Sequence, residues 1–129
     1  MLSGIHDIYS EQKCEYSITF QYYNSADAAI NFMDSYDNVR FVARRSSLVQ
    51  AKDLFEISQD GTATEGHVPF PVSEVYGTIS VSTNQIIINI STDTMTSIYP
   101  GSYFYYVFLE SSGGENDCLV KGKFVVEAP

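Results

Sequence analysis

The chain has no tryptophan, only two cysteines and two histidines, and only seven basic residues in a length of 129. The two cysteines lack a Cys-x-x-Cys spacing, so they support neither a redox motif nor a zinc site. Sixteen acidic residues against seven basic ones give a formal net charge of −9, which argues against nucleic-acid binding. The composition therefore excludes several common classes of function before any structural element is placed.

Long apolar runs are also absent. No stretch approaches the roughly 20 residues that span a bilayer, and residues 1–7 lack the basic and apolar segments of a signal peptide. We therefore expect no membrane contact and synthesis in a cytoplasm. In that compartment Cys14 and Cys118 are expected as free, buried thiols, although a bridge stays open if the first and last strands pair.

Length and composition favour one globular domain. A chain of this size can bury roughly two thirds of the surface that it exposes when unfolded, and 44% of its residues are hydrophobic, so it can form a sizeable core. We predict a single domain over residues 1–129, with residues 1–13 as an N-terminal tail or arm.

Alternation of apolar and polar residues is typical of half-buried strands. It predicts strands at 15–23, 39–45, 78–81, 85–90, 102–110 and 119–127, with short apolar pieces at 30–32 and 54–57. Strand 102–110 is apolar or aromatic on both faces, so we expect both faces to be covered. Gly122 inside the last strand suggests a bulge or a close approach of another segment.

Two segments depart from the strand pattern. Residues 92–98 carry capping side chains and predict one short helical turn between sheets. Residues 62–77 contain two prolines, which exclude a central strand and favour a long loop or an edge element. The whole pattern predicts an all-β fold, an antiparallel immunoglobulin-like β-sandwich with one short helical turn.

A turn and a tyrosine open the strongest strand. Pro100 and Gly101 form the turn and Tyr103 follows, preceded by the apolar Ile98. This arrangement resembles the tyrosine corner of immunoglobulin-like and fibronectin-type sandwiches, in which a tyrosine hydroxyl bonds back to the chain a few residues upstream. Tyr103 is the candidate for that role, with an ordinary core tyrosine as the alternative.

A wider pattern runs through most of the chain. It consists of an early aromatic-Ala-Arg strand, an Asp-Gly turn, an isoleucine-rich strand, a Ser/Thr/Asp helical turn, Gly-x-Tyr-x-Tyr and a final Gly-x-Phe-x-Val strand. The residues that match are Phe41, Ala43, Arg44, Leu54, Ile57, Asp60, Gly61, 86–90, 92–94, 101–105 and 122–126.

This order of elements resembles a small sandwich domain of bacteriophage virion proteins, found in tail, baseplate and fibre-attachment components. The resemblance implies a virion structural protein, a tail, baseplate or neck adaptor or a decorating subunit. It implies location in the virion after synthesis in the host cytoplasm. Its partners would be other virion proteins and further copies of itself in a homo-oligomer.

We find no set of residues that supports catalysis. His6 and His67 lack acidic or cysteine partners at ligand spacing, and the serines lie in predicted turns and on strand faces. The carboxylate pairs Asp34 with Asp37 and Glu115 with Asp117 could bind calcium or serve a glycosidase, but acidic residues in turns are expected for solvation alone. We predict no enzyme, no catalytic residue, no metal and no cofactor.

Aromatic residues are abundant, with ten tyrosines and eight phenylalanines. Tyrosine is favoured at interfaces because it buries a large area at low entropy cost and keeps a polar group. The interface candidates are Tyr22, Tyr23, Tyr36, Tyr76 and Tyr106. Exposed aromatics also suit a carbohydrate- or host-surface-binding module, which is the alternative function, although the absence of tryptophan weakens it.

Overall fold

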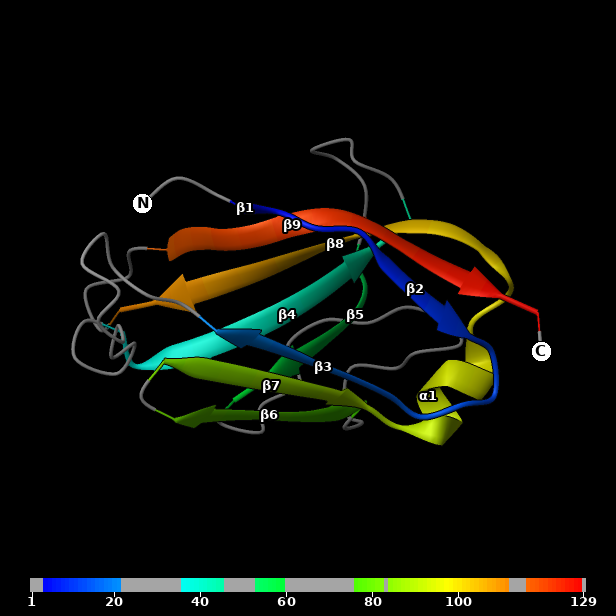
Figure 1. Cartoon of the computed structure of the whole chain (residues 1–129), viewed down its shortest axis with the longest axis horizontal. Helices are drawn as coiled ribbons and strands as arrows, with labels where there is room; N and C mark the ends of the chain where they lie inside the picture. The colour runs from blue at the N-terminus through cyan, green and yellow to red at the C-terminus, as the bar shows by residue number, and fades with distance from the viewer. Residues whose placement is uncertain are drawn as a thin grey trace.

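The computed structural model describes residues 4–21, 36–45, 53–59, 76–82, 84–111 and 116–128. Two β-sheets pack face to face, and one short helix lies at one end of the molecule (Figure 1). We name the larger sheet A and the smaller one sheet B. This is the all-β, immunoglobulin-like sandwich with one helical turn that the sequence predicts.

Sheet A has six strands in the order β1-β9-β8-β4-β5, with β2 also paired to β9. Its strands are β1 Gly4–Ile5, β2 Ile8–Glu11, β4 Asn38–Arg44, β5 Asp53–Ser58, β8 Gly101–Glu110 and β9 Asn116–Glu127. Sheet B has the order β3-β7-β6. Its strands are β3 Tyr16–Gln21, β6 Gly77–Ser82 and β7 Gln85–Ile90.

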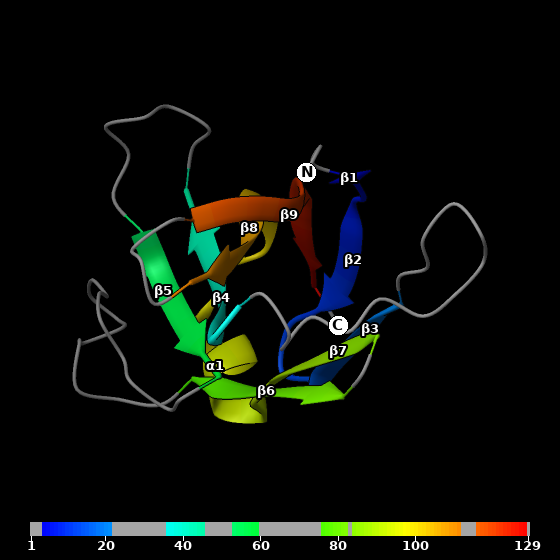
Figure 2. The same ribbon diagram turned by 90° about the vertical axis from the view of Figure 1, so that its left-hand side faces the viewer.

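Residues 4–11, expected as a tail or arm, belong to sheet A instead. β1 and β2 both pair in parallel with β9, which makes sheet A mixed rather than purely antiparallel. Figure 2 shows β2 beside β9 at one side of the sandwich. The alternation in β2 escaped detection because Ile8 is its only buried apolar residue, while the other buried position is Ser10, whose hydroxyl donates to the Val125 carbonyl at 3.1 Å.

The short helix α1, Thr92–Ser97, carries the chain from sheet B to sheet A. Ser91 caps it, because its Oγ accepts a hydrogen bond from the Thr94 backbone amide at 3.2 Å. The Thr94 hydroxyl donates to the Tyr76 carbonyl at 2.9 Å, which ties the helix to the start of β6. Met95 is fully buried, so α1 also closes one end of the core. No helix in the described ranges is long and apolar enough to cross a membrane.

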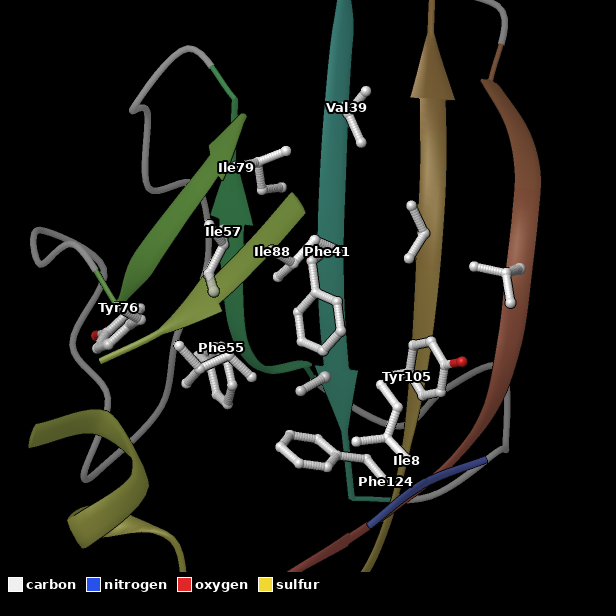
Figure 3. Packing of buried hydrophobic residues seen from close by; sticks show 14 of the residues in the cluster. Ile8, Val39, Phe41, Phe55, Ile57, Tyr76, Ile79, Ile88, Tyr105 and Phe124 are labelled. Atoms are coloured by element: carbon white, nitrogen blue, oxygen red, sulfur yellow. The ribbon is translucent and has the colours of Figure 1, made fainter. Parts of the chain in front are cut away.

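The core lies between the sheets and centres on Phe41 of β4. Its ring stacks on Tyr105 at a centroid distance of 5.6 Å and meets Phe55 and Phe124 at 6.1 and 6.2 Å. Figure 3 shows these rings facing Ile88 and the other buried residues of sheet B. Burial of such side chains contributes about 1.5–3 kcal/mol each, so the aromatic centre holds the sheets together.

The thiol prediction is correct in one respect and wrong in another. Cys14 and Cys118 are both thiols outside any disulfide, but Cys14 is exposed and Cys118 is only half-buried. Cys14 lies in the turn between β2 and β3, and Cys118 faces outward opposite Phe108. The apolar piece at 30–32 and nearly all of the proline-bearing segment 62–77 lie outside the described residues.

Candidate interaction surface

The outer face of sheet A carries a row of aromatic side chains. Phe104, Tyr106 and Phe108 alternate along β8 with inward residues such as Tyr105, so all three point away from sheet B. The Tyr106 and Phe108 rings lie 5.8 Å apart at 10°, a stacked arrangement. All three residues are half-buried, so the outward face of this strand is only partly covered, whereas its inward face is covered as expected.

Basic residues surround this row. Arg40 and Arg44 of β4 lie in register with Phe108 and Phe104, and Lys121 and Lys123 of β9 lie in register with Tyr106 and Phe104. Residues in direct register point to the same face of a sheet, so four of the seven basic residues gather here. We call these seven residues, namely Arg40, Arg44, Phe104, Tyr106, Phe108, Lys121 and Lys123, the aromatic-cationic face.

The arginines contact the neighbouring side chains. The Arg44 guanidinium carbon lies 5.1 Å from the centre of the Tyr106 ring, within the range of a cation–π interaction. Arg40 forms ion pairs with Glu56 at 3.7 Å and with Glu110 at 3.3 Å. These contacts hold the cations in place beside the rings.

A hollow of about 220 Å³ opens at the β4 side of this face. Arg40, Val42, Arg44, Glu56, Phe108 and Glu110 line it. Asn38 supports its wall, because its amide nitrogen donates to Glu110 at 2.7 Å and to the Ser58 hydroxyl at 3.0 Å. The hollow holds two cations and two anions, so its lining is neutral while the rest of the aromatic-cationic face is basic.

The crossover from α1 to β8 contains the hydrogen bond that a tyrosine corner requires. The Tyr103 hydroxyl donates to the Tyr99 carbonyl, four residues upstream, at 2.6 Å. The intervening Pro100 and Gly101 are both exposed. Burial raises the pKa of Tyr103, and the Arg45 charge partly offsets this rise. The bond lies where the chain passes from one sheet to the other.

The five interface candidates differ in their environments. Tyr106 belongs to the aromatic-cationic face. Tyr36 is half-buried, packs against the core and donates to Asp117 at 2.5 Å. Tyr76 is only 3% exposed, so its prediction as an interface residue is wrong: its ring packs against Phe55 between the sheets. Tyr22 and Tyr23 lie outside the described residues.

Other residues of this face were missed from the sequence. The sequence pattern predicts that Phe104 and Phe108 lie on a covered face. The four cations are far apart in the sequence, between residue 40 and residue 123, so nothing local links them. Only the register of β4, β8 and β9 brings them together. Two further exposed tyrosines, Tyr9 at 64% and Tyr99 at 77%, also went unpredicted.

The described residues hold no group of three or more His, Cys, Asp or Glu side chains that could bind a metal ion. His6 is exposed, and its ring contacts the Phe20 ring edge-on at 6.1 Å. Of the two carboxylate pairs, Asp34 and Glu115 lie outside the described residues, and Asp117 accepts the hydrogen bond from Tyr36.

No family model matches the chain, and neither does any curated protein. Solved structures do resemble it. One, the extracellular domain of the voltage-gated sodium channel beta4 subunit, matches with a TM-score of 0.45 and 14% identity over 100% of this chain and 96% of its own. That structure is a parallel homodimer that explains a role in cell-cell adhesion.

A second match is a chain from a structure on T cell specificity and activation by the bacterial superantigen toxic shock syndrome toxin-1. It has a TM-score of 0.53 and 11% identity over 93% of this chain and 92% of its own. This likeness shows the fold alone. The sodium channel match is weaker still, so the functions of both proteins stay with them.

Proposed function

We propose that this chain is a non-catalytic structural module that binds an acidic protein surface through the aromatic-cationic face. The observation that carries the proposal is the gathering of four cations and three half-buried aromatic rings on one sheet face of a chain with net charge −9. Arg40 is paired with Glu56 and Glu110, so the excess positive charge of the face lies toward Lys121 and Lys123. This charge has no role in the core, because all seven residues point outward.

The chemistry of the face suits protein binding. Aromatic residues and arginine supply much of the affinity in protein interfaces, and charge complementarity steers partners and fixes their orientation. Tyr106 and Phe108 provide a flat apolar centre, and Lys121 and Lys123 provide exposed charge beside it. The net negative charge elsewhere repels an acidic partner from other faces, so binding is directed to sheet A.

The resemblance to phage sandwich domains narrows this proposal to a virion structural protein. In that setting the module is a tail, baseplate or neck adaptor or a decorating subunit, made in the host cytoplasm and incorporated into the particle. This narrower role rests on the sequence pattern, to which the comparisons with known proteins add nothing.

Affinity capture from a phage-infected lysate tests both levels of the proposal. We expect the wild-type protein to retain one or more virion proteins in low salt and to lose them as salt screens the charges. The double variant Lys121→Glu with Lys123→Glu is expected to retain none. The matched control is Thr78→Glu with Ser80→Glu, which adds two acidic residues at exposed positions on sheet B.

The possible outcomes separate binding through the aromatic-cationic face from the role in a virion. Equal capture by the Lys121→Glu, Lys123→Glu variant and the control contradicts the role of the face. Capture of host proteins alone, lost in the same variant, keeps the binding face and contradicts the virion role. Capture of nothing under any condition contradicts the whole proposal.

A carbohydrate-binding function has one observation in its favour. The half-buried, nearly parallel rings of Tyr106 and Phe108 offer aromatic surface of the kind against which sugar rings pack. A glycan array measured with the wild-type protein and with Tyr106→Ala separates this function from the first. A defined glycan signal that the substitution abolishes would support it, and an empty array would remove it.

A further inference from the structure

The outward face of sheet B carries no charged side chain within the described strands β3, β6 and β7. The pairing of β3, β7 and β6 sets nine residues in three rows. The rows are Ser17–Asn89–Thr78, Thr19–Ile87–Ser80 and Gln21–Gln85–Ser82. A typical protein surface is roughly 30% charged, so about three charges are expected among nine residues. In a chain of net charge −9, two copies joined at an edge of this sheet therefore bring no like charges together across its outward face.

β3 is an end strand without the usual protection of a sheet edge. Within the described ranges it pairs with β7 alone. Exposed edges are normally protected from pairing by charged residues, prolines or bulges, and β3 has none of these. The end strands of sheet A follow the rule, since β2 carries Glu11 and β5 carries Glu56.

The inward side of β3 is also incompletely covered. Tyr16 and Ile18 point toward the core but remain half-buried, whereas Ile86 and Ile88 on the adjacent β7 are fully buried. At the opposite end of sheet B, Val81 of β6 is also only partly buried, but β6 approaches sheet A at Gly77, where the Ile57 side chain lies close. Apolar surface is therefore left uncovered at the β3 side.

We propose that β3 pairs antiparallel with β3 of a second copy, about a two-fold axis near Thr19, and joins the two B sheets into one six-stranded sheet. Main-chain hydrogen bonds supply the affinity of such strand addition. The axis places Thr19 opposite its own copy, a favourable cross-strand pair, and brings a second set of apolar residues against Tyr16 and Ile18.

The size of the contact sets its strength. A six-residue strand is about 20 Å long, and the resulting contact is smaller than the roughly 800 Å² per partner of a standard interface. The dimer is therefore weak and depends on protein concentration. In an assembly, where copies are held close together, the same contact becomes populated.

Sedimentation equilibrium from about 1 µM to about 1 mM protein tests the proposal. We expect a monomer–dimer equilibrium in the wild type. Thr19→Lys places two like charges opposite each other and is expected to raise the dissociation constant about tenfold or more. The matched control is Ser80→Lys, equally exposed, in the same row and on the other end strand. It is expected to leave the dissociation constant unchanged.

Disulfide trapping identifies the edge independently of affinity. In a Cys14→Ser, Cys118→Ser background, Thr19→Cys is expected to form a covalent dimer under mild oxidation, because residues opposite each other at a two-fold axis bring their Cβ atoms within reach. Ser80→Cys in the same background is expected to stay monomeric. Thermal unfolding of each variant verifies that it is folded.

Three results overturn the proposal. They are a monomer at all concentrations, a dimer that both lysine substitutions weaken equally, and trapping at Ser80→Cys but not at Thr19→Cys. The Lys121→Glu, Lys123→Glu variant is expected to keep the dimer, so failure of this inference is distinct from failure of the proposed function.

Discussion

The link between β1 and β2 lies alongside β9 at Gly122, and replacing this glycine with alanine is expected to destabilise the fold. An added Cβ would lie 2.2 Å from the His6 carbonyl oxygen, 2.8 Å from the His6 carbonyl carbon and 3.0 Å from Asp7 Oδ1. Two of these three atoms belong to the backbone and cannot rotate away. The Gly122→Ala protein must therefore shift the N-terminal strands away from β9.

The hydrogen bonds around Gly122 determine how much unfolding free energy is lost. The His6 amide donates to the Lys121 carbonyl at 3.0 Å, the Lys123 amide donates to Asp7 at 2.9 Å, and the buried Tyr105 hydroxyl donates to the His6 carbonyl. Each bond contributes about 1 kcal/mol, and overpacking costs about 1–3 kcal/mol. The reduced entropy of the unfolded chain returns about 0.4–1 kcal/mol. With all three bonds lost, the expected net loss is about 3–6 kcal/mol out of a total of about 5–15 kcal/mol.

Urea and thermal unfolding, followed by circular dichroism, measure this loss. For a domain of this size about 1 kcal/mol corresponds to roughly 3–4 °C, so Tm is expected to fall by about 9–24 °C. The neighbouring Lys121→Ala, at an exposed position, is expected to stay within about 0.5 kcal/mol of the wild type. A Gly122→Ala protein as stable as the wild type would refute the close approach at this position.

Three further predictions concern hydrogen bonds and charge. Tyr103→Phe removes the bond to the Tyr99 carbonyl and is expected to cost about 1 kcal/mol in urea unfolding near neutral pH. The raised pKa means that folded Tyr103 holds its proton more tightly than the unfolded chain does. The contribution of protonated Tyr103 to the free energy of unfolding is therefore present below about pH 10 and is lost as the pH rises through the folded pKa. The substitution should therefore flatten the alkaline fall in stability, and an unchanged fall would contradict it. Arg40→Met removes the ion pair with Glu56, whose side chain is only 6% exposed, and is expected to cost about 1–3 kcal/mol, part of which Glu56→Gln should restore in a double-mutant cycle. Thr94→Val removes the bond from α1 to the carbonyl before β6 and is expected to cost about 1–2 kcal/mol, whereas an unchanged unfolding midpoint would show that the helix is held by packing alone.

The alternation of apolar and polar residues along single strands made most of the fold predictable. The strands predicted at 85–90 and 102–110 agree with β7 and β8 to within one residue, because each follows the period of two without interruption. β1 and β2 were missed because their pairing with β9 joins residues more than 110 positions apart and leaves little local pattern. The close approach at Gly122 was one of two alternatives left open by the sequence, and the position of His6 identifies it as the correct one.

The candidate surface was less predictable than the fold. Its aromatic row is visible in the sequence as the second face of β8, but the sequence predicts Phe104 and Phe108 to be covered. An aromatic strand face has the same residue pattern whether it is buried or exposed. The cations Arg44 and Lys123 become neighbours of Phe104 only through the register of three strands. Side-chain chemistry thus indicates what a face can bind, and long-range register decides whether the face exists.

The two proposed contacts lie on different sheets and would reinforce each other. Pairing through β3 uses an edge of sheet B, while the aromatic-cationic face points away from sheet B in each copy. A dimer therefore presents two aromatic-cationic faces to a repeated acidic partner, and the second binding event becomes intramolecular, which can raise overall affinity by about 10²–10⁴-fold without any new contact. Thr19→Lys should then weaken binding to a repeated partner surface while leaving the affinity for a single partner unchanged, whereas Lys121→Glu with Lys123→Glu should weaken both.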